Sequence, residues 1–436
     1  MRALEKRPDG VVDIDPQACI GCKACLQGCP YDALYINESS GTAEKCHFCV
    51  HRTERGLAPA CAVACPTEAI IPGDFHDPDS VVSKMRAELD LQARKVEAGT
   101  GPNVLYREVA ESGIDPLQTN ASGGYLWANQ QGGDWLDAER FRASDETLAT
   151  EARTTYDVDR SAPWGWKISA YLFTKSLAAG LFLIAGLFLA TPSVRTTVGL
   201  GAGALVFLLA TLALLVADLK QPRRFATILL RPNWSSWIVR GSLILGVYSV
   251  LLVVWIAAWL GGAPLWVNVT IYVVGALFAV LTAGYTGWLF GQSKARVLWM
   301  RRGLWLHLVV QAVVAGAAMT LLADAVLPLP AASRSLLRWS LVAGLVLHAL
   351  FILTESRCAP ALREKEYRQV LRLITHGPFA ARHYAIGMVT GILLPCILLG
   401  VPETGGTWLF AAILVLVGLY VEEDTLVRAG QAQTIS

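Results

Sequence analysis

The chain contains 436 residues, of which 54% are hydrophobic and 17% charged, with a formal net charge of +2. The length predicts two or three domains. The hydrophobic residues gather after residue 164, which excludes an ordinary soluble globular protein. The balance of charge gives no indication of a nucleic-acid partner, and none is expected. The opening residues contain neither an apolar core nor a twin-arginine pair, so no signal peptide is expected.

Eight of the ten cysteines fall in two short groups, each ending in a Cys-Pro pair. The first group reads Cys19-x2-Cys22-x2-Cys25-x3-Cys29. This is the ligand spacing of bacterial ferredoxins, in which three close thiolates hold one iron–sulfur cluster and the fourth reaches a second cluster. Zinc sites and disulfides are the alternatives. The spacing differs from the paired cysteines that structural zinc prefers and from the spacing of crosslinks.

The second group reads Cys46-x2-Cys49, then eleven residues, then Cys61-x3-Cys65. It again supplies three ligands and one remote cysteine, so the two groups together predict two [4Fe–4S] clusters. The expected ligand sets are Cys19, Cys22, Cys25 and Cys65 for cluster 1, and Cys46, Cys49, Cys61 and Cys29 for cluster 2.

Both groups lie in stretches with a family resemblance. The segments CIGCKACLQGCPYDA and KCHFCVHRTERGLAPACAVACPTEAI resemble the iron–sulfur subunits of molybdopterin oxidoreductases of the dimethyl-sulfoxide and polysulfide reductase type. The resemblance implies a separate catalytic molybdenum or tungsten pterin subunit as partner, and it leaves room for an additional iron–sulfur subunit. Most such subunits carry four cysteine motifs and this chain carries two, so the path for electrons within it should be shorter.

Three regions are expected along the chain. Residues 1–106 should form a bacterial-type two-cluster ferredoxin, a small α+β domain, and residues 164–436 an all-α membrane domain. Between them, residues 107–163 are polar, contain two Gly-Gly pairs and show no sustained periodicity. Such a segment is either a flexible tether or a strap bound to a partner, and both interpretations stay open.

The membrane domain is predicted from apolar runs of about 20 residues, the length that crosses a bilayer. Tryptophan and tyrosine cluster at the ends of these runs, as they do at membrane interfaces. We expect eight transmembrane helices, at about 168–191, 197–217, 238–260, 265–287, 304–327, 336–355, 383–401 and 405–421.

The distribution of basic residues predicts the orientation. With eight spans, the termini and the loops after spans 2, 4 and 6 share one side, and these loops hold fourteen Lys and Arg residues against three on the other side. The positive-inside rule then places the cluster domain and both termini in the cytoplasm, at a bacterial inner membrane. Two alternatives remain: the basic loops grip the cluster domain, or the domain is exported folded with a signal-bearing partner.

The membrane region has a resemblance of its own. The segments PWGWKISAYLFTKSLAAGLFLIAG, DLKQPRRFATILLRPNWSSWIVRGSLIL and GYTGWLFGQSKARVLW resemble the NrfD-like membrane subunit of polysulfide reductase. The resemblance implies an eight-helix anchor that exchanges electrons with quinone and contains no haem. It also implies that Tyr285, in the sequence Tyr-Thr-Gly, contacts the quinone head group.

Polar side chains recur near the cluster-facing ends of six spans, where buried charge is costly and often functional. They are Lys175, Asp218, Arg240, Tyr285, His307, Gln311 and Glu355. His307 and Gln311 share a helix face because they are one turn apart. Asp324 lies near the opposite membrane face and could belong to a proton path or reach the interface.

These residues suggest one quinone site. We expect Tyr285 and His307 to contact the head group, with Gln311 nearby and Lys175 as a polarising cation. Asp218 or Glu355 should pair with Lys175 and donate protons, and His348, which shares a face with Glu355, could assist because histidine titrates near neutrality. The alternative is structural: buried ion pairs and helix caps serve stability alone.

The leading prediction is an electron-transfer and anchor subunit of a quinone-linked oxidoreductase whose substrate site lies on another chain. A first alternative is a haem-b subunit ligated by His307 and His348. A second is a redox-coupled ion translocator that uses the buried charges. Cys358 and Cys396 have no spaced partner and are expected to pack or to remain free thiols.

Overall fold

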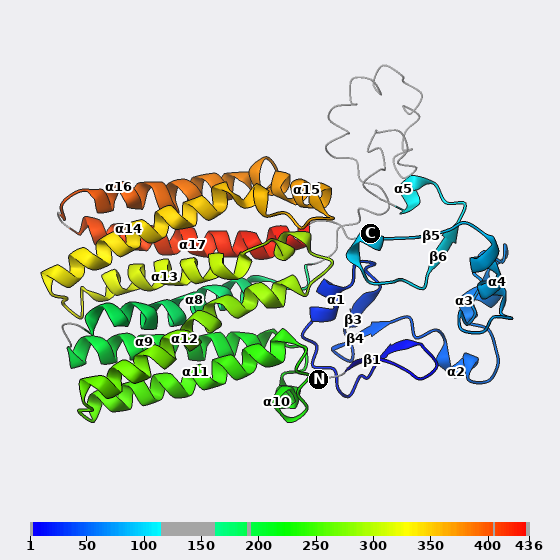
Figure 1. Ribbon diagram of the computed structural model, residues 1–436, viewed down its shortest axis with the longest axis horizontal. Helices are drawn as coiled ribbons and strands as arrows, with labels where there is room; N and C mark the ends of the chain where they lie inside the picture. Colours follow the sequence, from blue (N-terminus) through cyan, green and yellow to red (C-terminus); the bar gives the residue numbers. More distant parts are fainter. Residues whose placement is uncertain (1–2, 115–161, 190–192, 404–405, 433–436) are drawn as a thin grey trace, which may run out of the picture.

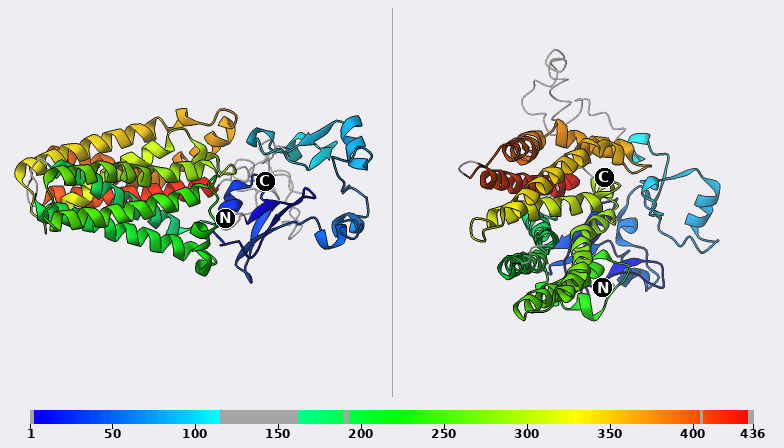
Figure 2. Two further views of the ribbon diagram at one scale, coloured as in Figure 1. Left: turned by 60° about the horizontal axis from the view of Figure 1, so that its bottom comes forward. Right: turned by 60° about the vertical axis from the view of Figure 1, so that its left-hand side comes forward.

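The computed structural model describes residues 3–114, 162–189, 193–403 and 406–432. It consists of a long bundle of helices with a smaller domain of strands and short helices at one end of it (Figure 1). Figure 2 shows the same arrangement from two further directions, and helix α1 lies where the two parts meet. Most of the polar stretch 107–163 lies outside the described residues.

The N-terminal domain is built from three antiparallel strand pairs joined by turns and short helices. The pairs are β1 (Leu4–Lys6) with β2 (Val12–Ile14), β3 (Leu34–Asn37) with β4 (Thr42–Lys45), and β5 (Leu91–Ala93) with β6 (Leu105–Arg107). The helices are α1 (Ala24–Gly28), α2 (Val50–Thr53), α3 (Ala60–Ala64), α4 (Val81–Glu88), η1 (Val96–Ala98) and α5 (Glu111–Ile114). Few side chains of this domain are fully buried. A domain this small usually needs a metal centre to supply the core that its side chains do not.

The membrane domain is entirely helical among the described residues after 162. Its long helices are α8 (Trp166–Ala185, extended by η5, Gly186–Phe188), α9 (Val194–Asp218), α11 (Trp237–Leu260), α12 (Leu265–Gly291), α13 (Leu304–Ala323), α14 (Ala331–Leu353), η9 (Arg382–Leu393) continued by α16 (Leu394–Gly400), and α17 (Thr407–Ala432). The connecting helices are η6 (Pro222–Arg224), α10 (Thr227–Leu230), η7 (Val297–Met300), η8 (Glu355–Cys358) and α15 (Glu364–Thr375).

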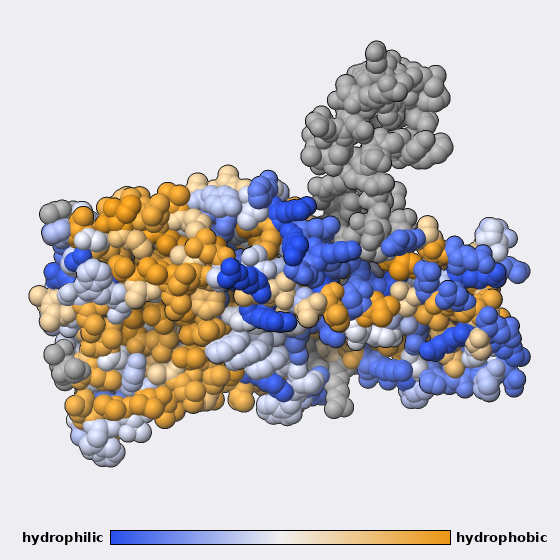
Figure 3. Space-filling model, turned by 45° about the horizontal axis from the view of Figure 1, so that its top comes forward, coloured by the Kyte–Doolittle hydropathy of each residue, from blue (hydrophilic) through white to orange (hydrophobic). Residues whose placement is uncertain are grey.

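Within the described ranges, seven helical segments are long and apolar enough to cross a membrane. They match the first seven predicted spans closely. The last helix, α17, has 26 residues but differs in carrying three consecutive acids, Glu422, Glu423 and Asp424. On the face that Figure 3 shows, apolar residues cover most of the helical region, and hydrophilic residues gather on the N-terminal domain and where it joins the helices. The chain is therefore a membrane protein with a polar domain at one end.

The long helices form two groups of four that meet along α8 and α13. In the first group α8 packs against α9 and α12, and α11 packs against α9 and α12. In the second group α13 packs against α14 and α17, while η9 and α16 pack against α17. The contacts between the groups are symmetric: the last helix of the first group, α12, contacts the first helix of the second, α13, and the last helix of the second group, α17, contacts the first helix of the first, α8. This is the packing pattern of an internal two-fold repeat with both halves in the same orientation.

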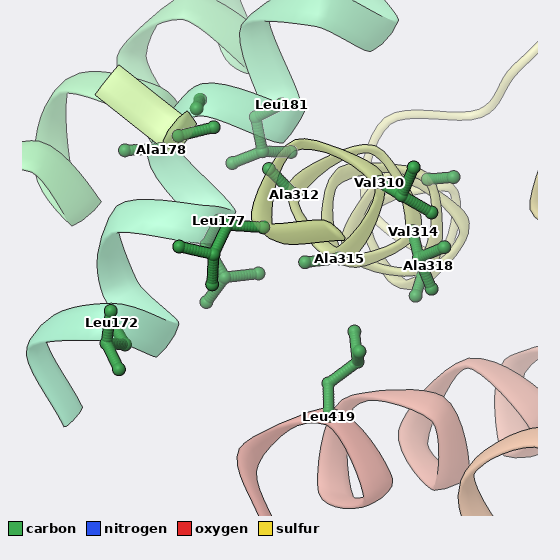
Figure 4. Close-up of a cluster of buried hydrophobic side chains, with 14 of the residues drawn as sticks. Leu172, Leu177, Ala178, Leu181, Val310, Ala312, Val314, Ala315, Ala318 and Leu419 are labelled. Atoms are coloured by element: carbon green, nitrogen blue, oxygen red, sulfur yellow. The ribbon is translucent and has the colours of Figure 1, made fainter. Parts of the chain in front are cut away.

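Small residues allow the two central helices to touch. A Cβ added at Gly180 of α8 would lie 1.8 Å from the carbonyl oxygen of Ala312, and one added at Gly316 of α13 would lie 2.0 Å from the carbonyl carbon of Gly180. Leucine, valine and alanine side chains fill the space around this contact, with Leu419 approaching from α17 (Figure 4). Close backbone packing at small residues is the usual way in which membrane helices associate.

One of the membrane helices is irregular. The segment η9 is a π-helix of 12 residues, a rare geometry that is usually found near functional sites. Pro395 follows it and cannot donate a backbone hydrogen bond. A Cβ at Gly418 of α17 would lie 2.2 Å from the Cα of Gly391, so the two helices are in backbone contact here. This contact positions the acids of α17 beside η9.

Buried polar contacts join the N-terminal domain to the membrane helices. The ammonium of Lys23 lies 2.8 Å from a carboxylate oxygen of Asp218 at the end of α9. The side chain of Gln27 donates to Gln431 of α17 at 2.6 Å and accepts from Arg296 at 2.6 Å. Burial lowers the pKa of Arg296 to about 10, which still leaves it charged at neutral pH. The first cysteine group is thereby held against the bundle.

Candidate functional site

The first cysteine group lies where the N-terminal domain meets the bundle. Its loop includes Gly21, at a φ of 67°, where a Cβ would lie 2.5 Å from the Cβ of Lys220. The backbone N–H of Ala43 points at the sulfur of Cys19 from 3.4 Å. The indole N–H of Trp164 donates to the carbonyl of Cys22 at 3.1 Å. Glycine and two donors thus shape a loop that lies against the membrane helices.

The thiols of this group influence one another. Burial raises the pKa of Cys25 to about 12, with the neighbouring sulfurs of Cys22 and Cys19 adding to the effect. A site that must hold several thiolates in an apolar environment therefore needs a positive charge, which iron supplies. All ten cysteines are free, so the eight that are grouped are available as ligands.

In the second cysteine group, Cys61 lies on α3 and the other three lie in the loops beside α2 and α3, with Cys46 and Cys61 exposed. Hydrogen bonding from Thr67 and from backbone N–H groups lowers the pKa of Cys65. Within the residues that the structure describes, no three histidine, cysteine or acidic side chains form a closed metal site. Ligand sites of this kind close around their metal rather than before it. The number and type of donors fit two clusters, and the exchange of Cys65 and Cys29 between them stays a prediction.

An apolar pocket opens beside the first cysteine group. Cys22 lines it from the cluster side, and Tyr285, predicted to contact quinone, lines it from α12. Asp218 lies at its edge, paired with Lys23. The remaining lining residues are Ile20, Trp164, Ile168, Tyr171, Leu215, Leu219, Phe225, Ile228, Ile238, Ser242, Leu245, Leu289 and Phe290. Aromatic and aliphatic walls with a few polar groups suit a flat hydrophobic ring that bears carbonyl oxygens.

A series of buried hydrogen bonds lies behind Tyr285. The ammonium of Lys175 donates to the hydroxyl of Thr286 and to the carbonyl of Ala283, each at 2.8 Å. The hydroxyl of Thr286 lies 2.8 Å from that of Tyr171, which in turn hydrogen-bonds to the hydroxyl of Tyr285. These groups can carry a proton from Lys175 to the wall of the pocket, because each hydroxyl both donates and accepts.

The expected acidic partners of Lys175 are corrected by this arrangement. Asp218 pairs with Lys23 of the cluster domain, and Glu355 pairs with Arg301. Asp218 lies at the end of α9 and Glu355 at the start of η8, just past α14. Each has a basic partner that the sequence places in a loop or another domain. The acid that interacts with Lys175 is Glu423 of α17. Its position lies just past the predicted end of the eighth span, which is why the sequence did not suggest it.

A second pocket, the polar pocket, lies in the other group of helices. His307, Gln311 and Glu355 line it, together with Arg301, His383 and Glu422. It contains neither Tyr285 nor Cys22. The prediction of one site that holds Tyr285, His307 and Gln311 together is therefore wrong: the residues divide between two pockets because α13 faces both groups of helices.

The hydrogen bonds of His307 define its protonation. Arg301 donates to Nδ1 at 2.7 Å, and since a guanidinium cannot accept, Nδ1 must carry no proton. Nε2 then carries the proton and donates to Nδ1 of His348 at 2.8 Å. Two histidines that bond directly cannot hold an iron atom between their facing nitrogens, since a ligand bond to each needs about 2 Å. This arrangement does not fit the proposed bis-histidine haem.

Asp324 lies at the opposite end of the bundle. It accepts a hydrogen bond from the backbone N–H of Leu329 at 2.6 Å and pairs with Arg334 at 2.8 Å. These contacts fix the turn between α13 and α14, and they test neither of the two predicted roles of Asp324, in a proton path or at the interface.

Several residues of the site escaped the sequence analysis. Tyr171 is one helical turn before Lys175, and this spacing could have revealed it. Trp164, whose ring packs against those of Phe290 and Trp299, belongs to the tryptophans that the sequence placed only at the membrane interface. Lys23 lies between two cysteines and gave no signal of a contact with a membrane helix. Its partner is 195 residues away, a distance that periodicity cannot bridge.

Comparison with known proteins agrees with both halves of the fold. Residues 155–435 match the family described as polysulphide reductase, NrfD, and residues 1–75 match the 4Fe-4S dicluster domain. The NrfD match covers more than half of the chain. The protein belongs to the NrfD family of membrane subunits and carries an iron–sulfur electron-transfer domain fused to its N-terminal side.

Individual relatives match the iron–sulfur part. One subunit of the tetrathionate reductase of Salmonella typhimurium is 42% identical over 123 residues, which is 28% of this chain and 49% of the relative. One subunit of the polysulfide reductase of Wolinella succinogenes is 36% identical over 108 residues, 24% of this chain and 56% of the relative. Protein NrfC of Escherichia coli is 39% identical over 99 residues, 22% of this chain and 44% of the relative. The chain thus spans about half the length of these relatives.

Proposed function

We propose that this protein passes electrons between two [4Fe–4S] clusters and a membrane quinone bound in the apolar pocket. The observation that carries the proposal is that Cys22 and Tyr285 line the same pocket. Cys22, a ligand of the cluster, and Tyr285, a hydrogen-bond donor to the head group, would then both lie beside the bound quinone. The clusters, when bound, supply one-electron carriers. Everything else is supplied by the side chains of the pocket.

Reduction of a quinone to a quinol takes two electrons and two protons, one proton for each carbonyl oxygen. The hydroxyl of Tyr285 is the donor that we assign to one oxygen, and it is resupplied through Tyr171, Thr286 and Lys175. The Lys175 ammonium, 5.5 Å from the ring centre of Tyr285, favours negative charge on the developing quinol. The ion pair of Lys23 and Asp218 holds the cluster loop at the mouth of the pocket.

The wider assignment follows from the family. We propose a subunit of a respiratory oxidoreductase in a bacterial inner membrane, whose substrate is converted on a separate molybdenum or tungsten pterin subunit. The eight long helices would all span the bilayer, with α17 keeping its acids at the cluster end. The basic loops support a cytoplasmic location for the cluster domain and both termini. The proposed domains are residues 1–106 and 164–436 with the linker 107–163.

Replacement of Tyr285 by Phe tests the site. The membrane-embedded protein with intact clusters is reduced with dithionite, and oxidation of the clusters by a water-soluble naphthoquinone is followed optically. We expect Tyr285→Phe to lower the rate roughly 10- to 100-fold. Tyr272→Phe is the matched control, since Tyr272 lies on the same helix and donates to Leu183 far from the pocket. Equal rates in the two variants would refute the assignment.

A further inference from the structure

The three consecutive acids of α17 point in three directions, because successive residues of a helix are separated by about 100°. Glu422 lines the polar pocket and accepts a hydrogen bond from His383 at 3.0 Å. Glu423 faces α8, where Ser176 donates to it at 2.8 Å. Asp424 accepts from Ser169 and from the half-exposed Arg382. The triplet therefore connects the polar pocket, the helix that bears Lys175 and the surface.

Glu423 is the acid whose charge acts on Lys175, where the hydrogen-bond series of the apolar pocket begins. Its side chain is fully buried. Among the described residues, its Oε2 atom has no hydrogen-bond partner. A buried oxygen in this position costs more free energy as part of a bare carboxylate than as the O–H of a neutral carboxylic acid. This environment favours a proton on Oε2.

A second buried oxygen points to the same route. Gln311, on α13, lines the polar pocket, and its Oε1 atom has no hydrogen-bond partner among the described residues. Gln311 is 3% exposed, and α13 packs against both α8 and α17. A buried acceptor of this kind can be satisfied by a water molecule in the pocket. Water or a hydrated proton has the required chemistry.

We propose that Glu423 donates protons to the apolar pocket, where the quinone binds, and that the polar pocket supplies the next proton to Glu423. The inference rests on the proposed function, which supplies the reaction that consumes the protons. For each quinone reduced, two electrons arrive from reduced clusters and two protons arrive through Lys175, Thr286, Tyr171 and Tyr285. After each transfer the carboxylate of Glu423 takes a proton from the side of Gln311 and Glu422.

The groups in and beside the polar pocket determine how it holds a proton. Arg301, beside η7, and Glu355, on η8, form an ion pair at its edge. His307 of α13 and His348 of α14 form the neutral pair described above, and His383 of η9 faces Glu422 of α17. His307, His383, Glu355 and Glu422 line this pocket together and offer groups that can donate and accept protons.

Two variants at one position separate proton transfer from packing. Glu423→Gln keeps the size and the hydrogen bond to Ser176 but cannot release a proton, whereas Glu423→Asp keeps the acid on a shorter side chain. With reduced clusters and the naphthoquinone, we expect Glu423→Gln to lower kcat about 10- to 100-fold with KM unchanged within about twofold. Glu423→Asp should recover part of this loss. Glu364→Gln, at an exposed acid on α15, is the matched control and should equal the wild type.

Infrared difference spectroscopy gives a readout independent of turnover. Reduction of bound quinone in the wild type should change a protonated-carboxyl band, and Glu423→Gln should remove that change. Iron content of each variant reports correct assembly. The proposal is overturned if Glu423→Gln keeps both its rate and the band while Tyr285→Phe slows the reaction, a result that leaves the quinone site intact. If Tyr285→Phe also has no effect, the quinone site itself is wrong.

Discussion

The two pockets occupy corresponding places in the two halves of the membrane domain and differ in chemistry. Each lies beside the start of a central helix, α8 or α13, and near an acid at the end of the following long helix, Asp218 or Glu355. The first pocket is lined by aliphatic and aromatic residues and borders a cysteine group. The second is lined by histidines, acids and an arginine. A repeated framework thus carries one apolar and one polar pocket.

The largest effect is expected from a substitution at the contact between α8 and α13, because this contact supports both pockets. Gly316→Val would place a branched side chain against the backbone of Gly180, where even a Cβ lies 2.0 Å from a backbone atom. Overpacking at such a contact should cost about 3 kcal/mol and lower the midpoint of thermal unfolding in detergent. Gly246→Val is the control, because a Cβ there meets nothing within 4 Å. A stable Gly316→Val protein would mean that the halves are not joined at this point.

The next effect concerns the apolar pocket alone. Ser242→Phe would fill part of the space beside Tyr285, so we expect KM for the naphthoquinone to rise roughly 10-fold, equivalent to about 1.4 kcal/mol of binding. Ser249→Phe is the control on the same face of α11, two turns further along and outside the lining. If both variants raise KM equally, the ring does not bind in this pocket.

The smallest effect concerns the contact between cluster loop and pocket. Trp164→Phe keeps an aromatic ring beside Phe290 and Trp299 but removes the N–H donated to the carbonyl of Cys22. Loss of one such bond is worth about 0.5–1 kcal/mol. We therefore expect the reduction potential of the nearest cluster to fall by roughly 20–40 mV in a redox titration followed by electron paramagnetic resonance. Trp166→Phe, at an exposed position, should leave the potential unchanged.

The sequence predicted what depends on local pattern. Apolar runs located seven spans within a few residues of the helices, since bilayer thickness sets their length. The eighth helix runs through Glu422 to Ala432, past its predicted end, because its acids are paired inside the bundle rather than left in water. The segment 331–335, predicted as loop, belongs to α14. Hydropathy alone predicts neither the pairing of acids inside a bundle nor the extension of α14 through residues 331–335.

The site was predictable in part and for a similar reason. Tyr285 was suggested by a family motif, and it does line a pocket with a cluster cysteine. The partners of Lys175 and His307 could not be deduced, because they depend on how α13 and α17 rotate within the bundle. A difference of about 100° decides whether Glu422 or Glu423 faces α8. Such rotations are determined by close contacts such as that of Gly391 with Gly418, which no periodic pattern contains.

The buried bonds of Gln27 with Gln431 and Arg296 have a kinetic consequence. A carrier that diffuses to its acceptor delivers electrons at a rate that depends on how much of each is present. Here the first cysteine group and the pocket belong to one polypeptide and are fastened to each other, so their effective concentration is fixed by covalent connection. Dilution of the protein should leave the transfer step between them unchanged.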